Sequence, residues 1–394
     1  MPEMNVKIHR GNNQIGGNIV EISTETTRIL LDVGVELDGD ENERPEIEGL
    51  FENAAFDAIF ISHYHKDHVG LAYGTDTNIP IYIGERSYKI LKATDEYFKR
   101  ETFIPKGFLE NEKTIEIGDI KVTPFLCDHS AFDSYMILCE SNEEKILYTG
   151  DFRSNGRKSF SALLKRLPEK VDKLICEGTT LSRENYISIP EKELEEQAVK
   201  IFKETAGPVF VLQSATNIDR IVTMYRAAKR SGRIFLEEVY MADIASAAGE
   251  SIPNPAFSDV YAFITNPGRH EELKKYGNRM GKERIAKTPF VMCVRSSMLN
   301  YIKKLSELVS FENGVLIYSM WSGYKENENT KRFLDECEKL GLVIKMVHAG
   351  GHADTETIKE LIKRVSPDEI IPIHTEEPEW FEHENFGKEN IEHR

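Results

Sequence analysis

The sequence predicts an α/β protein in which a strand-rich domain is interrupted by an α/β insertion and completed by the end of the chain. Short apolar or alternating runs, which are typical of strands, dominate the first ~180 residues. From about residue 189 strands and helices alternate, which is the pattern of βαβ units. After Val343 two strand-like runs return around one helix.

The expected elements follow in chain order. In the first part a helix at 87–100 stands among strands at 5–10, 17–23, 27–34, 57–63, 79–84, 121–129, 134–140, 144–151 and 172–178. The insertion begins with a helix that Pro190 opens, with acidic residues in its first turns. Its elements are a helix at 190–206, a strand at 208–214, a helix at 217–232 and a strand at 233–238. The last part has strands at 343–351 and 368–376 on either side of a helix at 355–366.

Composition and charge exclude several classes of protein. The 394 residues include 50 Lys and Arg against 66 Asp and Glu, which gives a net charge of −16. With 40% hydrophobic residues the chain can build sizeable cores, which excludes a disordered protein. No apolar run approaches the ~20 residues of a membrane-spanning helix. Because the acidic chain does not attract nucleic acid overall, a phosphate substrate must be held by a local cleft or by metal ions.

The cysteines and the N-terminal sequence favour a cytoplasmic protein without membrane association. The five cysteines are odd in number, scattered and never in a CxxC pair, so a disulfide framework or an all-cysteine zinc site is disfavoured. The first residues, MPEMNVKIHRGNNQ, lack the apolar stretch of a signal peptide.

The run SHYHKDH at residues 62–68 carries the strongest chemical signal. His63 and His65 stand two residues apart at the end of an extended run, so both imidazoles point to the same face. Asp67 and His68 follow where the strand turns into a loop. Four potential ligands in six residues favour two adjacent metal ions over one structural ion. The alternative is a polar loop of hydrogen-bonded histidines.

Three further candidate ligands stand at matching places. His129, Asp151 and His374 each follow a predicted strand directly. At one edge of the sheets they would meet the four candidate ligands of SHYHKDH. A polar loop of hydrogen-bonded histidines does not explain why seven such residues should meet there. Imidazole and carboxylate ligands suit Zn²⁺ or Mn²⁺, and a carboxylate can bridge two ions.

These residues resemble the metallo-β-lactamase fold. The pattern HxHxDH, a later histidine after a strand and then TGD match that fold in order and spacing. Asp32 in LLDVG resembles its first motif, an acid that supports the metal loop from outside the ligand set; an ordinary aspartate at a strand end is the alternative. The resemblance implies an αββα sandwich.

The second half of the chain resembles the β-CASP nucleases. Glu177 in CEGTT resembles their motif A, His352 in GGHAD their motif B and His374 in PIHTE their motif C. The run QSATNIDR at 213–220 resembles a segment of ribonuclease J. The resemblance implies a metallo-β-lactamase domain of residues 1–192 and 342–394 and an inserted α/β β-CASP domain of residues 193–341.

Two positions depart from ribonuclease J. Gly350 stands where those enzymes carry a serine that lines a phosphate pocket, and Gly178 stands where serine is common in motif A. Those enzymes usually continue into a C-terminal domain, whereas about 20 residues follow His374 here, so the resemblance is to a short form. Dimerisation through the C-terminal domain is therefore not expected, and a homodimer would have to form through another surface.

The resemblance also implies a site and its chemistry. Two Zn²⁺ ions, or Mn²⁺, would bind, with His63, His65 and His129 on one, Asp67, His68 and His374 on the other, and Asp151 bridging. The implied catalytic residues are Asp67, Glu177 and His352, with His352 stabilising or protonating the developing charge. Substrate phosphates would contact Ser214, Thr216, Asn217, Arg220 and His352.

A phosphodiesterase that acts on single-stranded RNA is the first interpretation, because TNIDR is closer to ribonuclease J than to the DNA-repair or messenger 3′-end branches. A DNA nuclease is second. A small-molecule hydrolase of the lactonase or glyoxalase type is third, because those proteins usually lack the insertion. A metal-bound but inactive RNA-binding subunit is disfavoured, because the chain keeps all seven candidate ligands. Exonuclease and endonuclease activity are both open.

Overall fold

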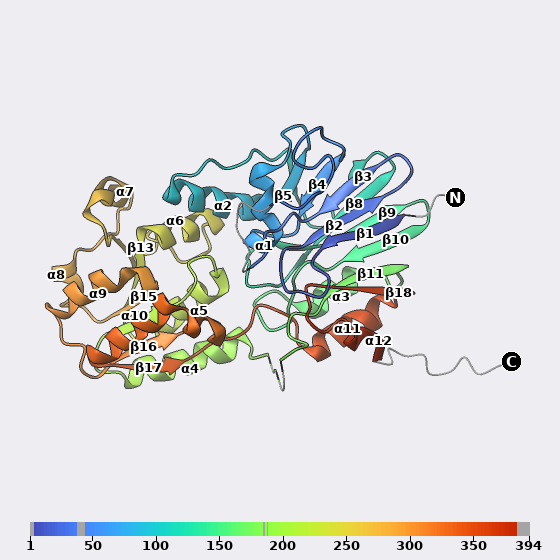
Figure 1. Ribbon diagram of the computed structural model, residues 1–394. Coiled ribbons are helices and arrows are strands. Elements are labelled where there is room, and N and C mark those ends of the chain that lie inside the picture. The colour runs from blue at the N-terminus through green and yellow to red at the C-terminus, as the bar shows by residue number, and fades with distance from the viewer. Residues whose placement is uncertain (1–3, 38–43, 184–185, 187, 384–394) are drawn as a thin grey trace. The chain divides into compact units, whose positions relative to one another are not determined.

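The computed structural model describes residues 4–37, 44–183, 186 and 188–383. The chain forms two compact units (Figure 1). Unit 1 comprises Met1–Asp95, Arg100–Ser188 and Gly351–Arg394, and unit 2 comprises Glu96–Lys99 and Ile189–Gly350.

Unit 1 contains two six-stranded sheets. The first, in the order β1-β2-β3-β4-β5-β6, consists of β1 (Asn5–Arg10), β2 (Ile19–Ser23), β3 (Arg28–Leu31), β4 (Ala58–Ile61), β5 (Ile81–Gly84) and β6 (Gly107–Leu109). The second, in the order β18-β11-β10-β9-β8-β7, consists of β7 (Ile115–Ile117), β8 (Ile120–Cys127), β9 (Ser134–Ser141), β10 (Glu144–Tyr148), β11 (Lys173–Glu177) and β18 (Glu369–Ile373). β18 pairs in parallel with β11, so a strand from the last part of the chain completes this sheet (Figure 1).

Apolar side chains join the two sheets of unit 1 face to face. One buried cluster contains Val20, Ile29 and Phe60 from the first sheet and Ile137 and Ile175 from the second. Alternate residues of a strand point to opposite faces of its sheet, which allows a second cluster on the far side.

The far side of the second sheet is covered by helices. Ile146 and Tyr148 of β10 face the first sheet, whereas Leu147 between them packs in a different buried cluster. That cluster contains Leu163 of α3 (Phe160–Arg166) and Leu361 of α11 (Thr355–Val365). The other helices of unit 1 are α1 (Lys66–Val69), most of α2 (Glu85–Phe98), and α12 (Trp380–His383).

Unit 2 contains one parallel sheet with helices between its strands. Its order is β14-β13-β15-β12-β16-β17, with β12 (Val209–Leu212), β13 (Ile234–Glu238), β14 (Val260–Phe263), β15 (Phe290–Val294), β16 (Gly314–Tyr318) and β17 (Leu342–Met346). Its helices are α4 (Glu191–Glu204), α5 (Ile218–Arg230), α6 (Val239–Ala248), α7 (His270–Lys274), α8 (Lys282–Ile285), α9 (Leu299–Ser306) and α10 (Glu328–Lys339). The inner strands are buried on both faces, as expected for a parallel sheet between helices.

The ends of unit 2 differ from the boundaries expected for the insertion, 193 and 341. Unit 2 runs from Ile189 to Gly350, because β17 pairs in parallel with β16 and so belongs to the sheet of unit 2. Within the described residues, no helix combines the length and the apolar character needed to cross a membrane.

Candidate metal centre

The candidate ligands lie directly after strands of unit 1. His63 and His65 follow β4, and His129, Asp151 and His374 follow β8, β10 and β18. Asp67 and His68 lie in α1, the single helical turn that continues from His65. The structure brings all seven side chains together, as the sequence predicts.

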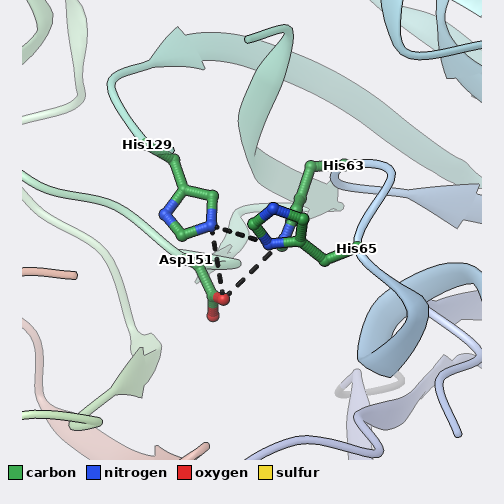
Figure 2. Close-up of side chains that lie close together, drawn as sticks. All are labelled: His63, His65, His129 and Asp151. Carbon is green, nitrogen blue, oxygen red and sulfur yellow. Dashed lines mark hydrogen bonds and ion pairs between the residues drawn. The ribbon is translucent and has the colours of Figure 1, made fainter. Parts of the chain in front are cut away.

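Asp151 lies at the centre of this cluster. Two groups of four share it: His63, His65, His129 and Asp151 (Figure 2), and Asp67, His68, Asp151 and His374. Within each group the potential ligand atoms lie within 4.8 Å of one another. Oδ2 of Asp151 lies 3.1 Å from Nε2 of His68, and 3.7 Å from Nε2 of both His63 and His129. The carboxylate is therefore placed to contact ions bound by either group.

Hydrogen bonds on the outer side of the rings turn the imidazole lone pairs inward. Nδ1 of His68 lies 2.7 Å from Oδ2 of Asp32, and Nδ1 of His129 lies 2.6 Å from the carbonyl oxygen of Gly351. Carboxylate and carbonyl oxygens can only accept, so each Nδ1 carries the proton. The Nε2 atom of a neutral ring then has a free lone pair, which faces Asp151.

Thr179 orients His374 in the same way. Its hydroxyl donates to Oε2 of Glu177 at 2.6 Å and therefore accepts from Nδ1 of His374, which is 2.7 Å away. Nε2 of His374 points into the cluster, 3.1 Å from Oδ2 of Asp67.

Asp32 supports two of the ligand rings from outside the cluster. The carboxylate of Asp32 is buried and accepts three hydrogen bonds, each at 2.7 Å. The donors are the backbone nitrogen of Ser62, the Oγ of Ser62 and the hydroxyl of Tyr148. Because Oγ of Ser62 donates to Asp32, it accepts from Nδ1 of His63 at 3.0 Å. One carboxylate thus fixes His68 directly and His63 through Ser62, a common arrangement around metal ligands.

The polar atoms inside the cluster fit divalent cations. Among the described residues, Nε2 of His63, Nε2 of His68 and both carboxylate oxygens of Asp151 are buried without a hydrogen-bond partner. Buried polar atoms are costly unless something satisfies them. Nδ1 of His65 also lies only 3.1 Å from Nε2 of His129 (Figure 2), so a proton or a cation must separate the two nitrogens.

Burial and neighbouring charges shift the pKa values of the clustered residues. Burial lowers the pKa of His65 to about 4 and holds the pKa of His129 well below its usual range. Burial alone would raise the pKa of Asp151, but His374 and His68 outweigh it and hold that pKa well below its ordinary value. Burial alone would lower the pKa of His68 and His374, but Asp151 outweighs it and raises both pKa values. A bound cation would have to displace these protons, because a metal site requires neutral imidazoles and an ionised carboxylate.

Glu177 and His352 lie beside the cluster. Oε1 of Glu177 accepts from the backbone nitrogen of Phe152 at 2.9 Å, and its Oε2 lies 3.1 Å from Nδ1 of His352. The His352 side chain is 20% exposed, whereas that of Glu177 is fully buried. His352 also belongs, with Glu177, Asp151 and His374, to a third group of potential ligands. A substrate can reach His352 but not Glu177.

Two parts of the chain match families of metallo-hydrolases. Residues 13–192 match the metallo-beta-lactamase superfamily, and residues 339–388 match the Zn-dependent metallo-hydrolase RNA specificity domain. Together the matches span more than half of the chain and include all seven clustered residues. The chain belongs to the metallo-β-lactamase superfamily.

Known relatives of this superfamily member align with nearly the whole of its chain. Ribonuclease J of Sinorhizobium meliloti is 23% identical over 91% of the chain, which spans 66% of that protein. A probable RNase MJ4 of Methanocaldococcus jannaschii is 25% identical over 92% of the chain and 91% of its own length. An RNase J-like protein of the same organism is 26% identical over 94% of the chain and 92% of its own length. The crystal structure of a protein of unknown function from Enterococcus faecalis V583 matches with a TM-score of 0.79, at 21% identity and 95% coverage of each chain. The expected fold and the resemblance to ribonuclease J are thereby confirmed.

The residues expected to contact substrate phosphate lie in unit 2, between β12 and the first turn of α5. Ser214 is exposed, and its Oγ lies 2.9 Å from Oγ1 of Thr216. Asn217 caps α5, because its Oδ1 accepts from the backbone nitrogen of Arg220 at 3.1 Å. Ser214 therefore presents its hydroxyl at the surface, whereas Asn217 has a structural role.

Arg220 occupies a different environment from the one expected. Its side chain is fully buried, and its Nη2 lies 3.1 Å from Oε1 of Glu191. The guanidinium also donates to the carbonyl oxygens of Ser319 and Ala349 at 3.3 Å. It therefore joins four segments of unit 2 and does not present its charge to a phosphate.

Asp32 was predicted to support the ligands from outside the cluster, and it does so, but the other side chains in that role were not predicted. Ser62 and Thr179 stand inside the motifs SHYHKDH and CEGTT, so their proximity to the ligands was the available signal. Tyr148 reaches Asp32 across 116 residues of sequence, and nothing near it in the chain indicates that contact.

Proposed function

We propose that the protein is a two-metal phosphodiesterase that hydrolyses single-stranded RNA, with Zn²⁺ or Mn²⁺ in the centre. One observation carries the proposal: the outward Nδ1 atoms of His68, His129 and His374 are fixed by hydrogen bonds, and their Nε2 atoms converge on one ionised carboxylate, Asp151. Ligands oriented in advance on both sides of a carboxylate are the arrangement that two adjacent ions require.

The seven residues divide into two ligand sets. We assign His63, His65 and His129 to one ion and Asp67, His68 and His374 to the other, with Asp151 shared. Bound ions would supply charge neutralisation for the phosphate oxygens and would lower the pKa of a bound water to near neutrality. This chemistry suits phosphodiesters, which carry a negative charge at the reacting group.

We assign His352 to proton transfer with the substrate. Its Nδ1 faces the Glu177 carboxylate and its side chain is partly exposed, so its Nε2 remains available for a substrate. Glu177 is assigned as a positioning residue, because it is buried and acts through His352 and Thr179. Proton transfer by an oriented histidine contributes roughly 10²–10⁴-fold to a rate.

RNA is favoured over DNA by the similar proteins. The match to the RNA specificity domain, at residues 339–388, contains both His352 and His374, and three relatives carry ribonuclease names. The net charge of −16 means that binding depends on local groups. We assign the hydroxyls of Ser214, which is exposed, and of Thr216, which is half-buried, to that role.

A product analysis tests the proposal. The protein is reconstituted with Zn²⁺ or Mn²⁺ and incubated with end-labelled single-stranded RNA and with DNA of the same sequence. Metal-dependent cleavage of RNA in preference to DNA is expected, and the labelled products report whether cleavage starts at an end. Preferential cleavage of DNA would make the protein a DNA nuclease, and hydrolysis of lactones or thioesters without phosphodiester cleavage would contradict the proposal entirely.

A further inference from the structure

One segment of unit 2 is basic although the protein is acidic. Residues 265–304 contain ten Lys and Arg against three Asp and Glu, in a chain whose net charge is −16. The segment includes α7, α8 and β15 and most of α9. A local excess of positive charge raises the concentration of anionic ligands around it.

Half of these basic side chains are neutralised by the protein itself. Ion pairs join Arg269 to Glu272, Lys274 to Glu271, Lys275 to Asp243, Arg295 to Glu238 and Lys303 to Glu336. By contrast, Arg279, Lys282 and Lys304 form no ion pair with a carboxylate of the described residues. All three line the same cavity. Arg284 and Lys287 also form no ion pair with the described residues but do not line the cavity, so three of the five unpaired cations are gathered at one place.

The cavity has the size and lining of a small-molecule site. Its volume is about 560 Å³, and small-molecule pockets commonly measure about 300–1,000 Å³. Ile264, Leu273, Met280 and Tyr301 give it apolar walls. None of the described residues that line it is acidic. An apolar cavity edged by three cations suits an anion that also carries a flat apolar group.

The groups in the cavity are held in place. The ring of Tyr301 is buried and packs against Phe263, with 5.2 Å between the ring centroids. Nζ of Lys282 lies 5.9 Å from the centre of the Tyr301 ring. Nη1 of Arg279 donates to the carbonyl oxygen of Tyr276 at 2.9 Å. An aromatic wall and a fixed guanidinium reduce the entropy that a ligand must lose on binding.

We infer that this cavity binds a nucleoside phosphate, either free or as one nucleotide of an RNA strand. The phosphate contacts Arg279, Lys282 and Lys304, and the base lies against the apolar walls that include Tyr301 and Met280. Asn300 and Thr265, which also line the cavity, offer hydrogen bonds to the base edge or the ribose. The inference does not rest on the proposed nuclease function, because every residue that it uses lies in unit 2.

Charge reversal at the cavity tests the inference. Binding of 5′-AMP to the full-length, metal-loaded protein is measured by calorimetry for the wild type, for Lys282→Glu with Lys304→Glu, and for Lys287→Glu. Lys287 is the matched control, because it is exposed, forms no ion pair with the described residues and does not line the cavity. The double variant should bind AMP about tenfold or more weakly, while Lys287→Glu binds like the wild type. AMP that binds only at the metal centre would give equal affinities in all three proteins and would overturn the inference.

Two further ligands separate the ligand classes. Inorganic phosphate should bind at least about tenfold more weakly than AMP, because it leaves the apolar walls empty; equal affinities would overturn the nucleoside assignment. A short phosphorothioate RNA, which resists hydrolysis, distinguishes the sources. If the double variant weakens binding of both AMP and the RNA, the cavity takes a nucleotide of a strand, and if it weakens binding of AMP alone, the ligand is a free nucleotide. If it weakens neither, the inference is wrong.

A separate measurement tests the metal centre independently of ligand binding in the cavity. Hydrolysis of bis(p-nitrophenyl) phosphate requires the metal centre but no strand binding, so the double variant should hydrolyse this ester like the wild type. Thermal unfolding of the double variant should also match the wild type, because both lysines are partly or fully exposed. A protein that binds AMP in the cavity but cleaves no phosphodiester would contradict the nuclease proposal and leave this inference intact.

Discussion

Oε2 of Glu177 lies 3.1 Å from Nδ1 of His352, and the carboxylate is fully buried while the imidazole is partly exposed. The same Oε2 accepts the hydroxyl of Thr179, which in turn accepts from His374. One buried acid therefore fixes both a candidate metal ligand and the histidine that a substrate can reach. The two rings should keep their relative orientation whether or not a substrate is bound.

Replacement of His352 should affect the rate more than the metal content. His352→Ala removes the partly exposed ring but none of the seven side chains assigned to the ions. We expect near-normal metal content and a loss of roughly 10²–10⁴-fold in the rate of RNA cleavage. Metal analysis and single-turnover cleavage measure the two quantities. A loss of one ion would instead make His352 a ligand, as the third group of potential ligands allows.

Metal analysis should find about two ions per chain after reconstitution with Zn²⁺ or Mn²⁺. Asp151→Ala should lower that number and abolish most of the activity, because its carboxylate is shared by both ligand sets. Circular dichroism should report a folded protein, since the apolar clusters on both faces of the second sheet do not include Asp151. Turnover like the wild type in this variant would refute the bridging role.

Asp32→Asn should weaken metal binding although Asp32 is not among the clustered ligands. Its carboxylate accepts from Ser62, Tyr148 and His68, and an amide would place a donor against one of them. Losses of about 10–100-fold in metal affinity are typical for such outer partners. Asp57→Asn is the control, an exposed aspartate just before β4. Chelator competition compares the two variants, and equal affinities would argue against support by Asp32.

The strands that end at the metal centre could be predicted because burial dictates their composition. Residues 58–61 and 146–148, for example, are apolar runs, and a ligand follows each of them within three residues. Within unit 2, β14, β15 and β16 were not predicted, although β15 is buried throughout. Short apolar runs such as VYAF and GVLIY do not differ by themselves from segments of buried helices.

The environment of Arg220 could not be predicted from the sequence. Its motif, QSATNIDR, resembles a segment of ribonuclease J, and for that reason Ser214, Thr216 and Arg220 were expected to contact phosphate. The carboxylate that pairs with Arg220 belongs to Glu191, 29 residues earlier at the start of α4. Only the packing of α4 against α5 brings the two together. Long-range pairing of this kind leaves no local signal.

Arg220→Ala should destabilise unit 2 rather than weaken RNA binding alone. Removing one partner of a buried ion pair leaves Glu191 uncompensated, which typically costs roughly 3–5 kcal/mol. Arg230→Ala on the same helix is the control, because Arg230 pairs with Glu196 at the surface and such pairs contribute little to stability. Denaturant unfolding measures both. A variant of wild-type stability with impaired RNA binding would restore Arg220 as a phosphate contact.

The stability of unit 1 should depend on pH through Glu21. Oε2 of Glu21 lies 2.7 Å from Nε2 of His9, and its Oε1 accepts from Nε of Arg28 at 2.9 Å. Burial alone would raise the pKa of Glu21, but these partners lower it from 4.5 to about 2. Because the folded state favours the ionised form, the stabilisation is complete above pH 4.5 and is lost as the pH falls toward 2.

Glu21→Gln should therefore unfold at a lower temperature than the wild type at pH 7, and the difference should shrink as the pH falls from 4.5 toward 2. Thermal unfolding followed by circular dichroism across this range measures the difference. Glu25→Gln is the matched control, because Glu25 is exposed in the turn between β2 and β3 and forms no ion pair with the described residues. It should unfold like the wild type at every pH. A difference for Glu21→Gln that stays constant down to pH 2 would mean that lost packing, and not the lowered pKa, accounts for the effect.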